Sequence, residues 1–538
     1  MSDAAAIRRE SWLLGGIGFL LFIGGLWQQP FIGFESRFAV FAQEMLRHGP
    51  GWFPTTWGEP YPDYPVTGTL LIAFFSLPFG AVTRFSAALP TALAAALNLV
   101  ILYRLLAPHS RQWAFVALCL LVMTTTFLAE ARAISLDHMV ATVTLLAFYL
   151  AYSADRSARP ELRRWLPLAL ILGFCLRGPL GIVIPASAVV CYYALSSQWR
   201  ALLRFGMQAA ALLALMWLAL LALAYWQHGA DFMHEVVRMQ VAGRMETRGR
   251  PEPFYYFTRS FGNYALSYPL AALTLALLAP ALLRRPRGAA LQLMLMLAAA
   301  ALLILAGLSV PETKKPRYIL AATPMLAALA AWPWATIAGS PASRALRWLR
   351  ATLEVLFAVL PLLLIAALAV IHRRGGYDDL PLLLPCAVLA ALQIAALIAR
   401  LKLAAPRRGA VYAGIAALAM WSGAALVAEP MLLRKHDSSA FVAAVEAERR
   451  AQPGTLALFG MTKDGAAIKY LVNADVDLAP PSPQFPRDAA ALAALPRPAY
   501  LVIGADAAGA LPESALASAR RIASGQFNGE AFLAFYLP

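Results

Sequence analysis

The sequence predicts an all-α polytopic membrane protein with about 13 spanning helices, followed by a small C-terminal α/β domain. Of its 538 residues, 60% are hydrophobic and only 14% are charged, which leaves too little polar surface for a soluble globule of this size. Apolar stretches close to the roughly 20 residues that cross a bilayer recur along the chain. Lys and Arg gather in alternate connections between them. Most of the chain is therefore expected to face lipid.

The expected spans follow one another closely. The first begins after Arg8 and Arg9, and no small-residue cleavage site ends it before Pro30, so it is interpreted as a retained helix. Two short spans flank Arg177-Gly178-Pro179, where a charged turn indicates a short or re-entrant helical hairpin buried in protein. The expected spans lie at about 12–30, 84–106, 111–129, 134–153, 165–182, 182–197, 204–226, 265–283, 289–309, 318–338, 350–371, 380–399 and 409–428.

The distribution of Lys and Arg predicts the orientation of these spans. Short cytoplasmic loops carry an excess of both residues, and a cytoplasmic N-terminus puts most of the basic short connections on that side. The C-terminal domain is then expected in the periplasm. The connections that fit carry Arg104 with Arg111, Arg156, Arg159, Arg163 and Arg164, Arg200 and Arg204, Arg284, Arg285 and Arg287, Arg344, Arg347 and Arg350, and Arg400, Lys402, Arg407 and Arg408.

The net charge of +16 comes from the membrane portion alone. Residues 431–538 carry ten basic and ten acidic side chains, so the excess lies in the residues before them. This distribution favours orientation signals and anionic lipid head groups, and it argues against nucleic acid as a partner. All four cysteines lie in apolar stretches and none forms a C-x-x-C pair, so neither a disulfide framework nor a zinc knuckle is indicated.

Two domains are expected. A transmembrane domain covers residues 1–430 and carries two long outer loops, 31–83 and 227–264; long outer loops usually have a function. Beyond Pro430 the pattern changes to that of a small α/β domain over residues 431–538. The expected elements outside the spans are an interfacial helix over Thr67–Phe79, strands over Thr455–Phe459 and Tyr500–Ile503, and helices over Ser439–Arg450 and Ser514–Ser524.

The first long loop carries two candidate acids. Glu35 follows the first span in the segment 33–38, and Arg37 is close enough in sequence to pair with it. An acid beside a spanning helix is costly unless it has a partner or a function, although an exposed loop carboxylate explains this position as well. Asp63 stands among the alternating prolines of 60–65, which hold an extended loop; a plain surface turn is the alternative.

Four ionisable residues gather at the outer end of the fourth span. Glu130, Arg132, Asp137 and His138 lie between two apolar stretches, which mere solvation explains poorly. A structural salt bridge of Arg132 with Glu130 or Asp137 is the competing interpretation.

Basic residues on the outer side break the orientation rule. A short outer connection carries Lys314, Lys315 and Arg317, and Arg177 lies at or below the same surface. Together with Arg132 these side chains could clamp a phosphate, because the guanidinium fork and the ammonium charge both suit that group. Attraction to phospholipid head groups is the alternative.

Four motifs follow in a fixed order along the chain: Glu35-Ser-Arg-Phe38 with Glu44 after it, Asp137 in Ala-Arg-Ala-Ile-Ser-Leu-Asp, Arg177-Gly-Pro179, and Lys314-Lys-Pro-Arg-Tyr318 with Thr323-Pro324. In this order they resemble the polyprenyl-phosphate-dependent glycosyltransferases of the C-type fold. Within that group, the sequence is most similar to the bacterial lipid A aminoarabinose transferases and the protein O-mannosyltransferases. The resemblance covers most of residues 1–340.

The resemblance implies a membrane enzyme that takes a sugar from a lipid-phosphate carrier at the outer leaflet and transfers it with inversion. Two positions depart from the family pattern: Phe34 stands where an Asp usually precedes the Glu, and 64–66 replaces a Lys-Pro-Pro sequence. The implied catalytic residues are Glu35 and Asp137, the implied donor-phosphate ligands are Arg177, Lys314, Lys315, Arg317 and Tyr318, and the implied supporting residues are Arg37, Asp63, Arg132 and His138.

These observations give a function hypothesis. The chain is expected to be a glycosyltransferase of the bacterial inner membrane that moves a sugar from polyprenyl phosphate to a lipid A-like or other envelope glycan. A site rich in Arg and Lys and poor in carboxylates favours an anionic acceptor, which is already ionised and needs only positioning. A protein O-mannosyltransferase-like enzyme is one alternative. A non-enzymatic lipid or polysaccharide transporter is another, although no internal repeat supports it.

The expected partners are the lipid-linked sugar, the glycan acceptor and membrane lipids, with no nucleic acid. No cofactor is assigned. Glu35, Asp137 and His138 carry atoms that bind divalent metals, but their spacing matches no metal motif.

Overall fold

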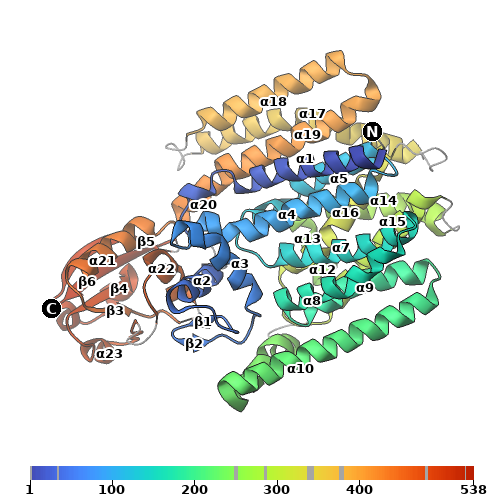
Figure 1. The fold of residues 1–538 in the computed structure, drawn as a ribbon. Coiled ribbons are helices and arrows are strands. Elements are labelled where there is room, and N and C mark those ends of the chain that lie inside the picture. Colours follow the sequence, from blue (N-terminus) through green and yellow to red (C-terminus); the bar gives the residue numbers. More distant parts are fainter. Residues whose placement is uncertain are drawn as a thin grey trace. The chain divides into compact units, whose positions relative to one another are not determined.

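The computed structural model of the chain is mostly helical (Figure 1). It describes residues 3–32, 36–246, 252–283, 288–335, 344–374, 381–463, 465–478, 483–527 and 529–538. The chain divides into two compact units. The first comprises Met1–Gly24, Pro62–Pro65 and Pro90–Val427, and the second comprises Gly25–Tyr61, Val66–Leu89 and Ala428–Pro538.

The first unit is a bundle of helices in which segments distant in sequence pack together, such as α5 against α19 and α7 against α9 (Figure 1). Its larger elements are α1 (Asp3–Ile23), α4 (Arg84–Leu106), α5 (Arg111–Met123), α6 (Thr125–Ala131), α7 (Asp137–Arg156), α8 (Leu166–Arg177), α9 (Leu180–Leu195), α10 (Trp199–Val237), α14 (Ser267–Leu283), α15 (Ala289–Ser309), α16 (Thr323–Ala330), α17 (Arg344–Arg373), α18 (Leu383–Lys402) and α19 (Ala405–Gly423). Short helical turns join them, including η4 (Pro160–Trp165), η5 (Arg238–Ala242), α11 (Gly243–Met245), α12 (Tyr255–Thr258), α13 (Ser260–Asn263), η6 (Pro316–Ala322), η7 (Trp332–Trp334) and η8 (Ala424–Ala428).

Six helices in the described part of the chain are long and apolar enough to cross a membrane. The number rises to seven if the bent pair α5 and α6, which meet at 74°, forms one broken span. The chain is thus a multi-pass membrane protein. The total of about 13 spans counts shorter helices as well and stays a prediction.

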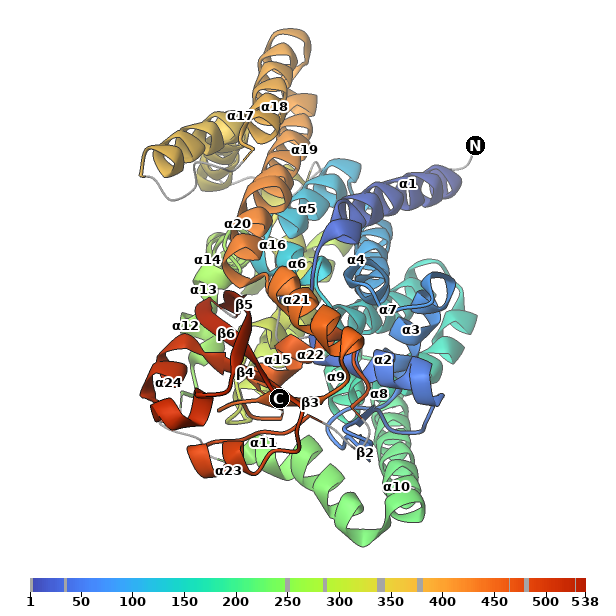
Figure 2. The ribbon, with the colours of Figure 1, turned by 90° about the vertical axis from the view of Figure 1, so that its left-hand side faces the viewer.

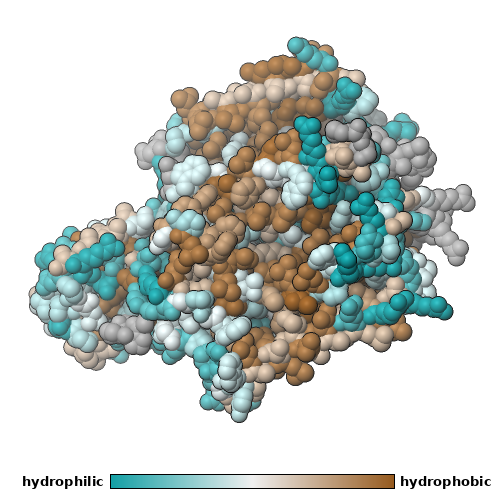
Figure 3. All heavy atoms as spheres, viewed as in Figure 1, coloured by the Kyte–Doolittle hydropathy of each residue, from teal (hydrophilic) through white to brown (hydrophobic). Residues whose placement is uncertain are grey.

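Several helices of the first unit expose their apolar side chains. Leu203, Leu215 and Leu218 of α10 are each more than 60% exposed, and α17 and α18 present similar surfaces. Figure 3 shows hydrophobic residues spread broadly over the helices, with hydrophilic ones gathered near the helix ends. Such surfaces are stable only in contact with lipid or another apolar surface.

The helical hairpin predicted around Arg177 is formed by α8 and α9. Its two helices approach so closely that a Cβ atom added to Gly181 would lie 1.8 Å from the Gly173 carbonyl oxygen. The turn itself depends on Gly178, whose φ of +61° is unfavourable for other residues, and an added Cβ there would meet Gln240 Oε1 at 2.2 Å. Three glycines therefore fix the position of Arg177 at the end of α8.

The second unit contains a four-stranded mixed sheet in the order β3-β4-β6-β5, which Figure 2 shows with its flanking helices. Strands β3 and β4 are parallel, and the other two pairs are antiparallel. Its elements are η1 (Leu26–Gln28), α2 (Arg37–His48), β1 (Thr55–Thr56), β2 (Glu59–Pro60), α3 (Thr67–Ser76), η3 (Leu77–Phe79), α20 (Glu429–His436), α21 (Ser439–Ala451), β3 (Thr455–Leu458), α22 (Ala466–Ala474), α23 (Ala489–Ala493), β4 (Ala499–Gly504), α24 (Ala505–Ala510), η9 (Glu513–Leu516), β5 (Arg520–Phe527) and β6 (Glu530–Leu537).

Alternate residues of the central strand β4 face opposite sides of the sheet. Leu501 and Ile503 pack in one core with Leu492 of α23, whereas Tyr500 donates a 2.7 Å hydrogen bond to the Gln452 carbonyl oxygen just after α21. Strands β3 and β4 and helix α21 confirm the elements predicted there. The helix predicted over Ser514–Ser524 is wrong, because those residues form the short turn η9 and the start of β5.

Candidate active site

Asp137, the first residue of α7, is at the centre of the candidate site. The turn before the helix is fixed by Thr91 of α4, whose Oγ1 donates to the Ser135 carbonyl oxygen and accepts from the Ser135 amide. The Asp137 amide in turn donates to Ser135 Oγ at 3.3 Å. A carboxylate at a helix N-terminus is favourably placed, because the free amides and the helix dipole stabilise negative charge there.

Two arginines from distant segments meet the Asp137 carboxylate. Oδ1 lies 3.8 Å from Nη2 of Arg177, and Oδ2 lies 3.0 Å from Nε of Arg317. All three side chains are nearly buried, with exposed fractions of 11%, 6% and 14% respectively. One buried carboxylate thus holds two guanidinium groups, leaving a net positive charge in a poorly hydrated place.

The Arg177 guanidinium lies between two tyrosine rings. Its central carbon is 5.1 Å from the ring centre of Tyr64 and 5.7 Å from that of Tyr318, within the range of cation–π contacts. Asp63, beside Tyr64 in sequence, adds a negative charge to the surroundings of Arg177. Tyr64, in the proline-rich first loop, was not among the predicted site residues. Its position next to the predicted residue Asp63 could have indicated that it belongs to the site.

The connection that carries Lys314 and Lys315 is held by two buried tyrosines. Tyr264 Oη donates to the Pro316 carbonyl oxygen at 2.8 Å, and the Lys315 amide donates to Tyr256 Oη at 3.2 Å. Burial raises the pKa of Tyr256, so its hydroxyl stays protonated at any physiological pH. These bonds set the backbone of the basic loop before any ligand binds.

An open cavity of about 440 Å³ lies beside this loop. Its lining includes Lys315 and Arg317 together with Glu130 of α6. Glu130 Oε2 is buried and has no hydrogen-bond partner in the part of the chain that the structure describes. The sequence showed Glu130 next to Arg132, but nothing in its pattern indicated that this carboxylate faces the same space as the basic loop.

Two further cavities lie in the same unit. One, of about 20 Å³, is lined by Asp137, Arg177 and Tyr318 and has room for about one water molecule. The other, of about 250 Å³, is lined almost wholly by apolar side chains, among them Phe261 and Leu302. Phe261 is two residues from Asn263, which lines the open cavity. A polar cavity and an apolar one are therefore neighbours along the α13 segment.

The remaining predicted cations have other contacts. Arg132 is 1% exposed, and its Nη1 and Nη2 donate to the Leu21 and Gly24 carbonyl oxygens at 2.7 and 2.8 Å. These bonds satisfy carbonyl groups at the end of α1, which is a structural role of the kind that C-terminal caps play. Lys314 Nζ lies 4.0 Å from Glu312 Oε2.

His138 is fully buried one residue after Asp137. Its Nε2 lies 3.0 Å from the Phe127 carbonyl oxygen, and its ring meets the Phe127 ring edge-on. These contacts tie α7 to α6.

Two predicted residues, Glu35 and Arg37, lie near the start of the first long loop. Glu35 lies outside the described residues, so its predicted catalytic role stays a prediction. Arg37, at the start of α2, donates from Nη1 to Tyr61 Oη at 3.1 Å within the second unit.

One group of described side chains has the donor atoms that a divalent cation requires. It consists of Glu44 and His48, one helical turn apart on α2, with Asp477, and the three ligand atoms lie within 4.8 Å of one another. The predicted metal candidates Asp137 and His138 are not part of this group.

The sequence is similar to two kinds of known protein. A family model described as dolichyl-phosphate-mannose-protein mannosyltransferase matches residues 63–226. The undecaprenyl phosphate-alpha-4-amino-4-deoxy-L-arabinose arabinosyl transferase of Pseudomonas aeruginosa (strain UCBPP-PA14) is 30% identical over 269 residues, which cover 46% of this chain and 47% of the relative. A relative of the same description from Pseudomonas fluorescens is 29% identical over 314 residues, or 55% and 53%. The chain spans about half the length of the curated relatives it matches.

Solved structures extend the likeness to nearly the whole chain. ArnT from Cupriavidus metallidurans, crystallised bound to undecaprenyl phosphate, aligns with a TM-score of 0.73 over 97% of both chains at 17% identity. The chain has the fold of ArnT. The apo form of ArnT gives a TM-score of 0.74 over 98% of each chain, and the Archaeoglobus fulgidus oligosaccharyltransferase gives 0.52 over 93% of this chain and 69% of that one.

These similarities confirm the resemblance that the four motifs predicted. The chain resembles the lipid-phosphate-dependent glycosyltransferases in sequence, and the ArnT likeness extends to the arrangement of its helices.

Proposed function

We propose that this chain is a glycosyltransferase of the bacterial inner membrane that moves a sugar from undecaprenyl phosphate to a lipid A-like acceptor. One observation carries the proposal: Asp137 holds Arg177 and Arg317 together beside an open cavity, in a chain with the ArnT fold. Curated relatives that are about 30% identical are named for transfer from the same carrier. The choice of lipid A as acceptor rests on the positive charge of the site, which suits a phosphorylated glycolipid.

The donor phosphate is proposed to bind in the 440 Å³ cavity, against Lys315 and Arg317. Cleaving the bond between sugar and phosphate leaves a phosphate that gains negative charge, and cations already held in position stabilise that charge. Asp137 orients Arg317 and holds Arg177 in place. The apolar cavity at Phe261 supports this placement, because a prenyl chain needs an apolar surface next to its phosphate.

The acceptor oxygen is proposed to attack the anomeric carbon on the face opposite the departing phosphate, which inverts the configuration. A phosphate acceptor is already ionised and needs only to be positioned. A hydroxyl acceptor must also give up its proton, for which Glu35 is the predicted base and Glu130 is a second carboxylate at the cavity. Glu130 lines the same cavity as Lys315, which supports this second assignment.

The topology is part of the proposal. About 13 spans, a cytoplasmic N-terminus and a boundary near residue 430 put the domain of 431–538 in the periplasm and the basic loop 314–317 at the outer leaflet. Undecaprenyl-linked sugars and lipid A would then meet on the side where Asp137 and Arg317 lie.

A second candidate is a protein O-mannosyltransferase-like enzyme, which the match of residues 63–226 to that family model favours. The donor chemistry would be the same, but the acceptor would be a Ser or Thr hydroxyl, which requires a base.

Intact-mass analysis of lipid A from strains with and without the chain separates these functions. The proposal expects a mass increase of one sugar residue on lipid A only when the chain is expressed, and its loss with the Arg317→Ala variant. Unchanged lipid A together with chain-dependent glycans on envelope proteins would favour the second candidate. No chain-dependent sugar on either would contradict both.

A further inference from the structure

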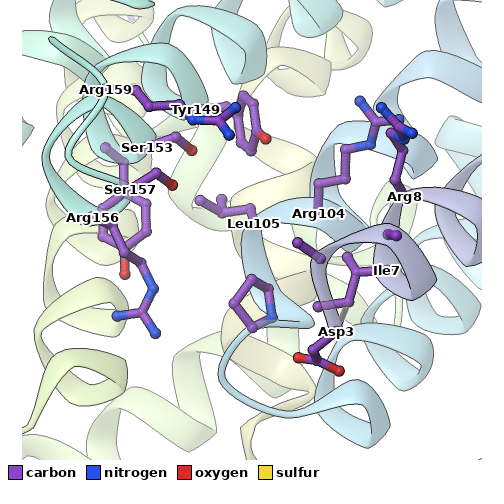
Figure 4. Close-up of a pocket in the computed structure, with 14 residues that line it drawn as sticks. Asp3, Ile7, Arg8, Arg104, Leu105, Tyr149, Ser153, Arg156, Ser157 and Arg159 are labelled. Atoms are coloured by element: carbon purple, nitrogen blue, oxygen red, sulfur yellow. The ribbon is translucent and has the colours of Figure 1, made fainter. Parts of the chain in front are cut away.

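A second basic cavity lies at the opposite end of α7 from Asp137. With 20 residues, α7 is about 30 Å long, so its last residue, Arg156, is far from the candidate active site. There, the start of α1 and the ends of α4 and α7 line a half-open space of about 670 Å³. Figure 4 shows Arg8 and Arg104 on one side of this space and Arg156 and Arg159 on the other.

The acidic residues that the structure describes do not neutralise these four arginines. Within the residues that the structure describes, none of them forms an ion pair with a carboxylate. Asp3 is the single acid in the lining, and its Oδ1 lies 2.6 Å from Nη2 of Arg111, outside the cavity. Asp3 is therefore engaged elsewhere, and the cavity keeps a large positive charge.

The arginines differ in how firmly they are held. The half-buried Arg104 is fixed: its Nε donates to Ser11 Oγ at 2.9 Å, and its guanidinium lies 5.0 Å from the ring centre of Trp12. Arg8, Arg156 and Arg159 are exposed. One cation is thus preorganised at the wall, and three others can close on a ligand from the rim.

The rest of the lining suits an amphiphilic anion. Ser153 and Ser157 supply hydroxyl groups along α7 and the turn after it, and Ile7, Leu105 and Pro108 supply apolar surface. Guanidinium groups and hydroxyls bind phosphate oxygens, while an apolar wall suits the glycerol and first methylene groups of a lipid. A plain patch of loop arginines would lack these hydroxyl groups and apolar walls.

We propose that this cavity binds a phosphate group, carried by an anionic phospholipid or free in solution. The charge distribution of the sequence predicts that this end of the helices is cytoplasmic, opposite to the predicted site of transfer. The proposal therefore concerns a separate site and does not depend on glycosyltransferase activity.

The test is native mass spectrometry of the purified full chain titrated with phosphatidylglycerol, phosphatidylcholine and inorganic phosphate. The variant is Arg8→Gln with Arg156→Gln, both exposed and therefore tolerant of change. The matched control is Arg200→Gln with Arg204→Gln, which removes two arginines from the same predicted side but outside the cavity. Melting temperatures check that both variants fold; if the double variant does not, Arg8→Gln alone is titrated.

The proposal expects the cavity variant to bind phosphatidylglycerol at least tenfold more weakly, the control to change by less than twofold, and phosphatidylcholine to bind poorly. Displacement of the lipid by millimolar inorganic phosphate would assign the site to free phosphate, and resistance to displacement would assign it to the lipid. Equal phosphatidylglycerol binding by the variant and the wild type would overturn the proposal, as would phosphatidylcholine binding equal to that of phosphatidylglycerol.

Discussion

At the scale of single residues, the site depends on a carboxylate shared by two arginines. Removing one member of a buried charge cluster leaves the others without compensation, at a cost of about 3–5 kcal/mol when burial is complete. Asp137 is the shared member, so the two guanidinium groups depend on it for their position. We propose that its role is to organise these cations for a phosphate.

The substitution Asp137→Asn keeps the shape of the side chain and removes its charge. We expect a rise in the donor KM and about a hundredfold fall in turnover, because Arg177 and Arg317 would repel each other out of position. Asp155→Asn, at the other end of α7 and paired with Arg163, is the matched control and should keep wild-type kinetics. Wild-type KM and turnover for Asp137→Asn would refute the role given to this carboxylate.

A second residue, Glu446 of α21, makes the stability of the second unit depend on pH. Its carboxylate accepts a 3.2 Å hydrogen bond from Tyr470 Oη and pairs with Arg449, but burial is the larger effect and raises its pKa above the ordinary 4.5. The folded state then holds this proton more tightly than the unfolded state does. The protonated Glu446 carboxyl therefore stabilises the folded state at pH values below its ordinary pKa. This stabilisation is lost as the pH rises from the ordinary pKa through the raised pKa of the folded state.

The substitution Glu446→Gln should remove this pH-dependent loss of stability, because glutamine does not titrate. Thermal melting between pH 4 and pH 7 should show the wild type losing stability relative to the variant as pH rises. If the melting temperatures of the wild type and the variant change in parallel over this pH range, the assignment of a raised pKa to Glu446 is contradicted.

At the scale of elements, the hairpin of α8 and α9 positions Arg177. Gly181→Ala would place a methyl group against the Gly173 backbone, so the helices would have to separate. We expect a large loss of folded protein, measured as the monodisperse fraction after purification. Gly206→Ala, in α10 with open space around it, is the control and should fold normally. A stable, monodisperse Gly181→Ala protein would show that the close approach is not required.

The strands of the second unit show which elements the local sequence pattern can predict. The parallel strands β3 and β4 could be predicted because each is a short run of buried apolar residues. Strand β5 could not, because Arg520, Arg521 and Ser524 give it a polar, helix-like sequence, and its structure comes from pairing with β6.

At the scale of the whole molecule, hydrophobicity and charge predict a membrane-spanning bundle. Basic residues in connections that are expected on the outer side indicate the candidate active site. Arg177 and Arg317 stood out because they are basic residues on the side where few are expected. Their shared contact with Asp137 could not be predicted, since it joins segments 40 and 180 residues away from that carboxylate. The contacts of Arg132 with α1 could not be predicted either, because every residue has a backbone carbonyl and the sequence does not show which one accepts a hydrogen bond.

The central claim is that this site cleaves a lipid-phosphate sugar by stabilising the phosphate that leaves. The most direct test supplies purified protein in detergent with undecaprenyl-phosphate-linked sugar and lipid A, and measures released undecaprenyl phosphate. We expect steady release by the wild type and a fall of about 10²–10³ with Arg317→Ala, the cost of losing one preorganised charge-stabilising group. Arg259→Ala, an exposed arginine paired with Glu252, should release at the wild-type rate. Equal release by Arg317→Ala and the wild type would contradict the claim.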